Sequence, residues 1–319
     1  MAKTMLEVRD LKKYFDTPGG ALHAVDGVSF TIAEGETLGV VGESGCGKST
    51  LGRLVLHLLD ITGGKVFFEG EDITKVNRAK LRELRNRMQI IFQDPFSSLN
   101  PRMTVSTAIA EPLIIAKYER SVIGKRVREL MATVGLADRL ANTYPHELDG
   151  GRRQRIGIAR ALALNPKFIV CDEPVSALDV SIQAQILNLM QDLQEQLGLT
   201  YIFITHDMSV VRYISHNICV MYLGQLLEKA PSRTLFEKTY HPYTKALLSS
   251  ILLPNIHQRR ERILIRGELS SPINPKPGCR FCVRCQYSRE RCGEETPALE
   301  EVEPGHFVAC HYVREINAL

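Results

Sequence analysis

A glycine-rich segment near the N-terminus constrains this 319-residue chain more than any other feature. Residues 42–49 read GESGCGKS, the complete G-x-x-x-x-G-K-[ST] pattern of a phosphate-binding loop. The apolar run Thr37–Val41 before it predicts a buried strand, and apolar residues at helical spacing after it predict a helix. This strand, loop and helix context favours phosphate binding over an ordinary glycine turn.

The residue types in this loop suit it to a nucleotide. Glycines let successive backbone N–H groups face the phosphates, and Lys48 can reach the β and γ oxygens. The Ser49 hydroxyl can hold Mg²⁺, while the helix N-terminus adds its dipole. We expect the phosphates to lie among Gly42, Glu43, Ser44, Gly45, Cys46, Gly47, Lys48, Ser49 and Thr50.

Composition excludes several classes of protein. A hydrophobic content of 44% is enough for a substantial core, and the length predicts one large domain with an appendage. No stretch of 18 apolar residues and no signal peptide is visible, so we expect neither a membrane span nor export. The formal net charge of +4 is small and the Lys and Arg residues are scattered, so we expect no nucleic-acid partner.

The first part of the chain has the pattern of a small antiparallel sheet. Apolar and polar residues alternate from Leu6 to about Ile32, with turn signals at Thr17–Gly20 and at Asp26–Gly27. The segment Lys65–Glu69 predicts another strand of the same layer.

Strands and helices then alternate. Met88–Phe92 predicts a strand that leads to Gln93, and helical spacing over about 104–164 predicts a helical insertion. Two further apolar runs, 167–173 and 199–206, predict strands separated by a helix. This order indicates an α/β class with a parallel sheet covered on both faces.

Two adjacent acids end one of these strands. Ligands of open α/β sheets bind at such strand ends, so Asp172 and Glu173 are expected beside the phosphates. Asp172 can hold Mg²⁺ through water, and Glu173 can polarise the water that attacks the γ-phosphate. The alternative is that the two acids merely cap the next helix.

Together with Gln93, the segment Ser176–Asp179 and His206, these motifs resemble the Q-loop, D-loop and switch histidine of ABC transporter ATP-binding subunits, over about residues 5–250. The resemblance implies an ABC ATPase fold over residues 1–255: a P-loop NTPase core with an antiparallel β subdomain and a helical subdomain at about 94–165. It implies ATP hydrolysis, with catalytic roles for Glu173, His206 and Gln93, and Mg²⁺ at Ser49, Gln93 and Asp172.

The same resemblance implies a dimer that sandwiches ATP between one subunit's phosphate loop and the other's signature motif. Here the signature reads LDGGR over 148–152, where the family usually has LSGGQ. Asp149 would bring negative charge toward the triphosphate, and Arg152 can supply a compensating cation. Gly150 and Gly151 remain, so the helix can still approach phosphate. We therefore expect an unequal pair with a second, related ATPase.

Tyr14 matches the position where the family stacks an aromatic ring on adenine. The alternative is ordinary core packing, because aromatic residues near strands are commonly buried.

The C-terminal part resembles one subgroup of the family. Tyr240–Leu248 is similar to a stretch of oligopeptide and dipeptide importer ATPases. After about Pro254, the charged run Arg259–Arg262 and several prolines predict a linker, so residues 256–319 are expected to form a linker and a small Cys-rich extension.

The cysteines there follow the pattern C-x₂-C-x₂-C-x₆-C-x₁₇-C. The resemblance implies a [4Fe-4S] cluster on Cys279, Cys285, Cys292 and Cys310, with Cys282 as the spare thiol. Zinc on four thiolates and reduced, metal-free thiols are the alternatives.

The sequence thus predicts an ATPase that drives import of di- or oligopeptides. Its expected partners are two membrane permease subunits, a related ATPase and an extracellular solute-binding protein, which would place it at the cytoplasmic face of the membrane. Another solute, such as a nickel chelate or an oligosaccharide, is an alternative, as is a soluble ABC ATPase acting on nucleic acid or ribosomes. A regulator without turnover would predict loss of Glu173 or His206, and both are present.

Overall fold

The computed structural model describes residues 3–94, 96, 98–251, 263–265, 267 and 271–319. It divides into two compact units. The helical unit contains residues 33–36 and 75–204, and the phosphate-loop unit contains residues 4–32, 37–74 and 205–319. The boundary expected at 255–256 and the charged run 259–262 lie outside the described residues. The described residues of the predicted extension share a unit with the N-terminal sheet.

The helical unit contains three parallel strands in the order β8-β7-β6. They are β6 (Met88–Ile91), β7 (Phe168–Asp172) and β8 (Thr200–Ile204), as predicted, and the last two are wholly buried. Its α-helices are α2 (Arg78–Arg87), α3 (Val105–Ile115), α4 (Arg120–Thr133), α5 (Gly150–Leu162) and α6 (Val180–Leu197), with short 3₁₀ turns at Asp138–Leu140 and Pro145–Glu147.

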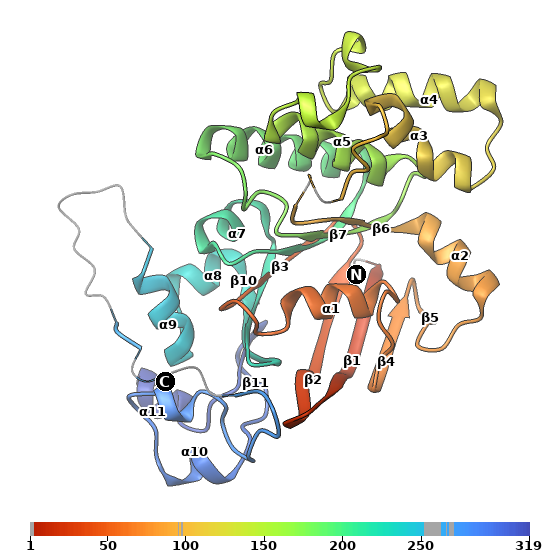
Figure 1. Ribbon diagram of the computed structural model, residues 1–319. Coiled ribbons are helices and arrows are strands. Elements are labelled where there is room, and N and C mark those ends of the chain that lie inside the picture. The colour runs from red at the N-terminus through yellow and green to blue at the C-terminus, as the bar shows by residue number, and fades with distance from the viewer. Residues whose placement is uncertain (1–2, 95, 97, 252–262, 266, 268–270) are drawn as a thin grey trace. The chain divides into compact units, whose positions relative to one another are not determined.

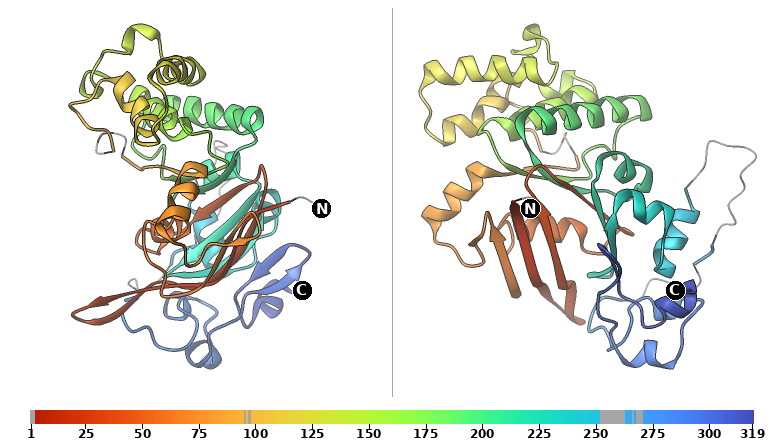
Figure 2. Two further views of the ribbon diagram at one scale, coloured as in Figure 1. Left: turned by 90° about the vertical axis from the view of Figure 1, so that its right-hand side faces the viewer. Right: turned by 180° about the vertical axis from the view of Figure 1, so that it is seen from behind.

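Helices α3, α4 and α5 pack side by side and confirm the predicted helical insertion (Figures 1 and 2). Their ends follow from side-chain caps: the Thr104 side chain accepts from the Thr107 N–H at the start of α3. Asp179 does the same for Ile182 at the start of α6, and Gly198 ends that helix in the left-handed conformation.

The phosphate-loop unit contains two sets of strands. The N-terminal sheet has the order β2-β1-β4-β5, with β1 and β4 antiparallel, which confirms the predicted antiparallel layer (Figure 2). The turn predicted at Asp26–Gly27 is wrong, because β2 continues through it and Gly27 takes a left-handed φ of 77° inside the strand. The strands are β1 (Thr4–Thr17), β2 (Gly20–Ala33), β4 (Gly63–Phe68) and β5 (Glu71–Asp72).

The second set runs in the order β11-β12-β10-β9-β3. β3 lies parallel to β9, while β10 lies antiparallel to both β9 and β12. The strands are β3 (Thr37–Val41), β9 (Asn217–Tyr222), β10 (Gln225–Pro231), β11 (Glu300–Glu303) and β12 (His306–Val308). The helices are α1 (Lys48–Val55), α7 (Met208–Ile214), α8 (Ser232–Glu237), α9 (Pro242–Ser249), α10 (Glu290–Glu294) and α11 (Val313–Asn317), with a 3₁₀ turn at Cys282–Arg284.

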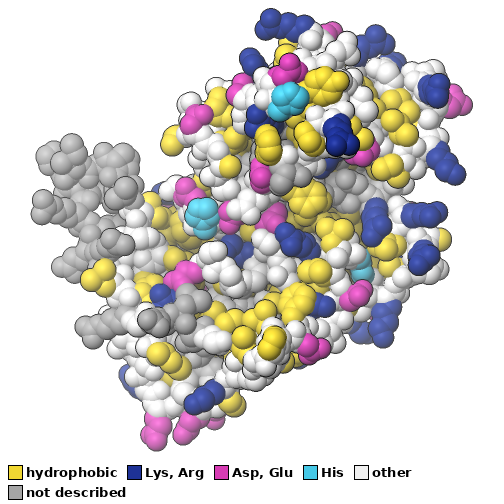
Figure 3. Space-filling view, in the orientation of Figure 1, with side chains coloured by type: hydrophobic (Ala, Val, Ile, Leu, Met, Phe, Trp, Pro, Cys, Tyr) yellow, Lys and Arg dark blue, Asp and Glu magenta, His cyan; other side chains and the backbone are white. Residues whose placement is uncertain are grey.

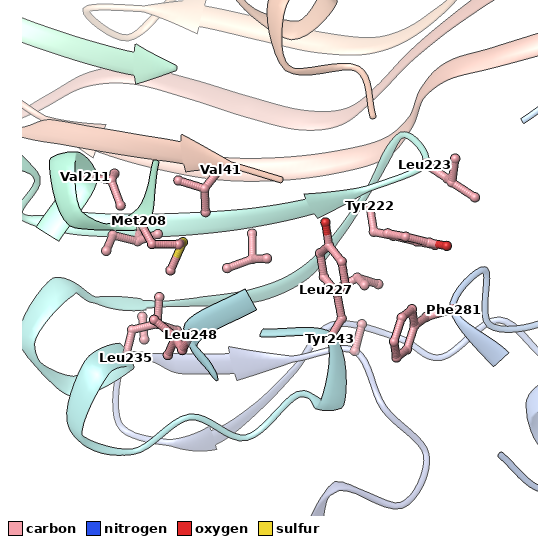
Figure 4. Packing of buried hydrophobic residues seen from close by; sticks show 14 residues of the cluster. Val41, Met208, Val211, Tyr222, Leu223, Leu227, Leu235, Tyr243, Leu248 and Phe281 are labelled. Atoms are coloured by element: carbon pink, nitrogen blue, oxygen red, sulfur yellow. The ribbon is translucent and has the colours of Figure 1, made fainter. Parts of the chain in front are cut away.

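The core of this unit joins parts of the chain that are far apart in sequence. Val41 of β3, residues of β9 and β10, and Tyr243 of α9 pack in one buried cluster that also contains Phe281 (Figure 4). Buried apolar surface is the main stabilising term for such a cluster. The C-terminal segment is therefore held through the same core that supports the strand before the phosphate loop.

On the face drawn in Figure 3, Lys and Arg side chains are distributed over several elements and interleaved with acidic ones. None of the described helices is long and apolar enough to cross a lipid bilayer.

Candidate functional site

The phosphate loop follows β3, which has the predicted bounds Thr37–Val41, and leads into α1, which begins at Lys48 within the motif. Two of its glycines are required by close approach as well as by backbone angle. A Cβ on Gly42 would lie 2.1 Å from the Met221 carbonyl oxygen, and one on Gly47 would lie 2.1 Å from that of Ala24. Gly47 also has a φ of 102°, which L-residues rarely adopt. The loop is thus closely packed against the neighbouring backbone.

Lys48 is nearly buried at the start of α1. Its Nζ donates to the carbonyl oxygens of Gly42 at 2.8 Å and Glu43 at 2.9 Å, and lies 3.7 Å from the Cys46 sulfur. The ammonium group therefore lies inside the ring of the loop, where it can donate hydrogen bonds to phosphate oxygens. Burial raises the pKa of the Cys46 thiol, so this side chain behaves as a neutral packing group.

Glu43 is held at both its backbone and its side chain. Its backbone N–H donates to the Tyr243 hydroxyl at 2.9 Å. Its carboxylate oxygens lie 3.1 and 2.9 Å from Nη1 of Arg284. Neither Tyr243 nor Arg284 was assigned to the site from the sequence, because no local pattern connects either to a loop 200 or more residues away.

Tyr14 lies on β1 and is half-buried, so it is not a core residue. Its ring stacks on His23 with centroids 3.9 Å apart, and its hydroxyl donates to Asp26 at 2.5 Å. Burial and the bond to Asp26 raise the pKa of Tyr14 to about 12, so the hydroxyl stays protonated. His23 and Asp26 were not predicted as site residues.

In the helical unit, the acidic pair Asp172 and Glu173 lies at the end of β7. Asp172 is buried at the end of the strand, while Glu173 follows it with a left-handed φ of 47°. The Glu173 N–H donates to the Ile204 carbonyl at 2.9 Å, and its Oε2 accepts from Gln93 Nε2 at 2.9 Å. A non-glycine residue with positive φ is uncommon and marks a position that the surrounding structure holds. Gln93 and Glu173, both assigned to the site from the sequence, are therefore in contact.

The signature motif, which reads LDGGR in place of the usual LSGGQ, lies at the start of α5. Asp149 is its N-cap, and its Oδ1 accepts from the Arg152 N–H at 2.8 Å. The Arg152 guanidinium lies 3.3 Å from the same carboxylate, which pairs the two charges of the motif; its compensating role toward a triphosphate stays a prediction. Gly151 permits the close packing of Ile182, since a Cβ there would lie 2.6 Å from that side chain.

The remaining motif residues lie where strands end. Ser176 Oγ donates to the Glu173 carbonyl at 3.1 Å, and Asp179 caps α6. In the phosphate-loop unit, His206 is exposed just after Thr205, whose N–H donates to the Val40 carbonyl of β3 at 3.1 Å. Asp207 then caps α7.

The five C-terminal cysteines line one small cavity, and none of the described cysteines forms a disulfide. The chain turns tightly there: the Cys279 N–H donates to the Cys292 carbonyl at 2.7 Å, and the Cys282 N–H to that of Cys279 at 3.0 Å. Burial raises the pKa of Cys279 to about 12. Within the described part of the chain, no three His, Cys, Asp or Glu side chains are grouped so that they could hold a metal ion. Cys282 lines the cavity with the other four, so its assignment as the spare thiol stays a prediction.

Two sequence families match the chain. The family described as ABC transporter matches residues 25–176, and the family described as oligopeptide/dipeptide transporter, C-terminal region, matches residues 227–292.

Similar proteins span nearly the whole length. The oligopeptide transport ATP-binding protein AppF of Bacillus subtilis is 52% identical, with 97% of each chain covered. The putative oligopeptide transport ATP-binding protein YkfD of the same organism is 52% identical over 97% of this chain and 96% of that one. A putative peptide import ATP-binding protein of Brucella ovis is 50% identical over 96% of this chain and 97% of its own length.

Solved structures show the same fold. The protein cbiO1 of Clostridium perfringens, part of the ABC transporter complex cbiONQ, matches with a TM-score of 0.67 and 29% identity over 74% of this chain and 92% of that chain. The ATP-binding cassette MJ0796, in a dimeric post-hydrolysis state with ADP and phosphate, matches with a TM-score of 0.65 and 31% identity over 72% of this chain and 99% of that chain.

Proposed function

The chain belongs to the ATP-binding proteins of ABC transporters, and we propose that its ATP hydrolysis drives the import of di- and oligopeptides. The observation that carries the proposal is the match of residues 227–292 to the oligopeptide/dipeptide transporter C-terminal region. Relatives that are half identical over nearly the whole chain bear peptide-import names. These comparisons do not favour a nickel chelate, an oligosaccharide, nucleic acid or a ribosome.

For hydrolysis we assign Glu173 to polarise the attacking water. Gln93 and His206 are assigned as further catalytic residues. The bond between Gln93 Nε2 and Glu173 Oε2 supports this role, because it orients the carboxylate without removing its charge. Lys48 would bind the β and γ oxygens, and Tyr14 would stack on adenine. Mg²⁺, held by Ser49 and Asp172 with Gln93, would neutralise phosphate charge.

For the C-terminal cysteines we propose a [4Fe-4S] cluster on Cys279, Cys285, Cys292 and Cys310. The donor chemistry fits, because a cubane takes four thiolates and these thiols line one cavity. Four-thiolate zinc is the alternative.

The signature suggests an unequal pair of ATPases. Asp149 caps α5 as a serine would, but its carboxylate cannot donate to a γ-phosphate unless protonated. We propose that a related partner ATPase supplies an ordinary signature to the site containing this chain's Glu173. Two permease subunits and an extracellular solute-binding protein would complete an importer, with this chain at the cytoplasmic face of the membrane.

Reconstitution tests the proposed function. The chain would be placed in proteoliposomes with its partner ATPase, permeases and solute-binding protein. Di- and oligopeptides should stimulate ATP hydrolysis several-fold and accumulate inside. Stimulation by a nickel chelate or an oligosaccharide, with none by peptides, would reassign the substrate.

A further inference from the structure

Residues 278–285, here called the arginine segment, are anchored in the core of the phosphate-loop unit. Phe281 is buried, and its ring packs on Tyr222 at 5.4 Å and on Tyr243 at 5.3 Å between centroids (Figure 4). Aromatic pairs at such distances add to the stabilisation from buried area. Arg280 and Arg284 flank this anchor, so their positions are fixed relative to the strands beneath.

Arg284 reaches the phosphate loop. Its Nη1 lies within hydrogen-bond distance of both Glu43 oxygens and donates to the Tyr222 hydroxyl at 3.2 Å. The Arg284 side chain is 11% exposed and that of Glu43 is 24% exposed, so solvent screens the pair less than a surface pair. The pair thus compensates a carboxylate that is covalently part of the phosphate loop.

That carboxylate matters for a triphosphate ligand. Glu43 precedes Ser44 in the loop, and its own carbonyl already accepts from Lys48. An uncompensated negative charge there would repel the phosphates and would also remain partly desolvated. Neutralising Glu43 is therefore a contribution to nucleotide affinity made from outside the loop.

Arg280 reaches the other end of the expected nucleotide. Its guanidinium donates to the Leu223 carbonyl and to Asp26. Asp26 also accepts from the Tyr14 hydroxyl, and its Oδ2 lies 3.1 Å from His23 Nδ1. Arg280 thus supports the carboxylate that orients the stacked pair of Tyr14 and His23.

We propose that Arg284 and Arg280 are positioning residues through which the arginine segment sets nucleotide affinity. Arg284 neutralises and orients Glu43 on the phosphate side, and Arg280 holds Tyr14 through Asp26 on the adenine side. The inference rests on ATP being the ligand, as proposed above.

Calorimetric titration of the full-length subunit with Mg-ATP tests the phosphate side. Arg284→Ala should weaken binding about 10-fold. In a Glu43→Gln background the same change should cost about 2-fold or less, because no charge is left to compensate. Arg284→Lys, which keeps a cation, should restore most of the affinity. Arg289→Ala is the matched control, since Arg289 lies in the same C-terminal part but pairs with the exposed Glu315.

The test of the adenine side compares nucleotides with a ligand that has phosphates but no base. Arg280→Met should weaken ATP and ADP alike while leaving inorganic tripolyphosphate unchanged, whereas Arg284→Ala should weaken tripolyphosphate as well. If Arg280→Met does not fold, Tyr14→Phe removes only the hydroxyl that Asp26 accepts and should show the same ligand selectivity to a smaller extent.

The outcomes are separable. Wild-type protein that binds no Mg-ATP contradicts the proposed function. If wild-type protein binds Mg-ATP, two results would contradict the role of Arg284. One is an equal loss of affinity from Arg284→Ala in the wild-type and Glu43→Gln backgrounds, and the other is a loss no larger than that from Arg289→Ala. Equal losses of ATP and tripolyphosphate in Arg280→Met contradict the role of Arg280.

Discussion

The Glu228 carboxylate lies 2.8 Å from Nε2 of His306, and neither side chain has any exposed surface. The carboxylate also accepts the backbone N–H groups of Tyr240 at 2.8 Å and His241 at 3.2 Å. Glu228 belongs to β10 and His306 to β12, so one acid joins the C-terminal hairpin and the start of α9 to the sheet. The buried carboxylate therefore has three hydrogen-bond partners. Removing it would leave those partners buried without an acceptor.

Glu228→Gln should therefore destabilise the protein by about 2–4 kcal/mol, because the amide NH₂ would face the N–H of either Tyr240 or His241, where an acceptor is needed. Glu237→Gln is the matched control: Glu237 pairs with Arg233 on the surface of α8, and its loss should change stability far less. Thermal and urea unfolding measure the difference. Equal effects of the two substitutions would show that the buried contacts do not stabilise this region.

Lys48 and Glu173 should act at different steps. Lys48→Ala should weaken Mg-ATP binding by about 10-fold or more, because the loop loses its cation. Glu173→Gln should leave binding intact, slow hydrolysis by about 100-fold or more and trap ATP in a closed dimer. Binding and single-turnover measurements separate these steps. Normal turnover by the Glu173→Gln protein would remove Glu173 from the mechanism.

The cysteine assignment is tested by metal analysis of anaerobically purified protein. About four irons per chain and a brown colour are expected, and Cys279→Ser, Cys285→Ser, Cys292→Ser or Cys310→Ser should bleach it. Cys282→Ser is the control that should keep the iron. Stoichiometric zinc with no iron would favour the four-thiolate zinc alternative.

The signature predicts which of two paired sites is slower. Loss of a charge-assisted contact to the γ-phosphate costs roughly 10- to 100-fold, so the site closed by Asp149 should be the slow one. In the reconstituted heterodimer, Asp149→Ser should raise total ATPase activity. Glu173→Gln in this chain should remove most of it. A fully active homodimer of this chain, or an Asp149→Ser protein no faster than wild type, would contradict the asymmetry.

Local signals predicted the strand and helix around the phosphate loop, the parallel strands and the helical insertion. Those signals depend on residues close together in sequence. They failed at Asp26–Gly27, where a glycine with positive φ lies inside a continuous strand. The pair of Arg284 and Glu43 could not be predicted in this way, because the two residues are far apart in sequence and no local pattern connects them.

The pair of Arg284 and Glu43 spans 241 residues, and that of Arg280 and Asp26 spans 254. During synthesis the phosphate loop leaves the ribosome long before both arginines. Contacts at such separation form late in folding, since the ends of a long loop must meet first. The phosphate loop therefore gains the charge compensation of Glu43 only after residues 280–284 have been synthesised.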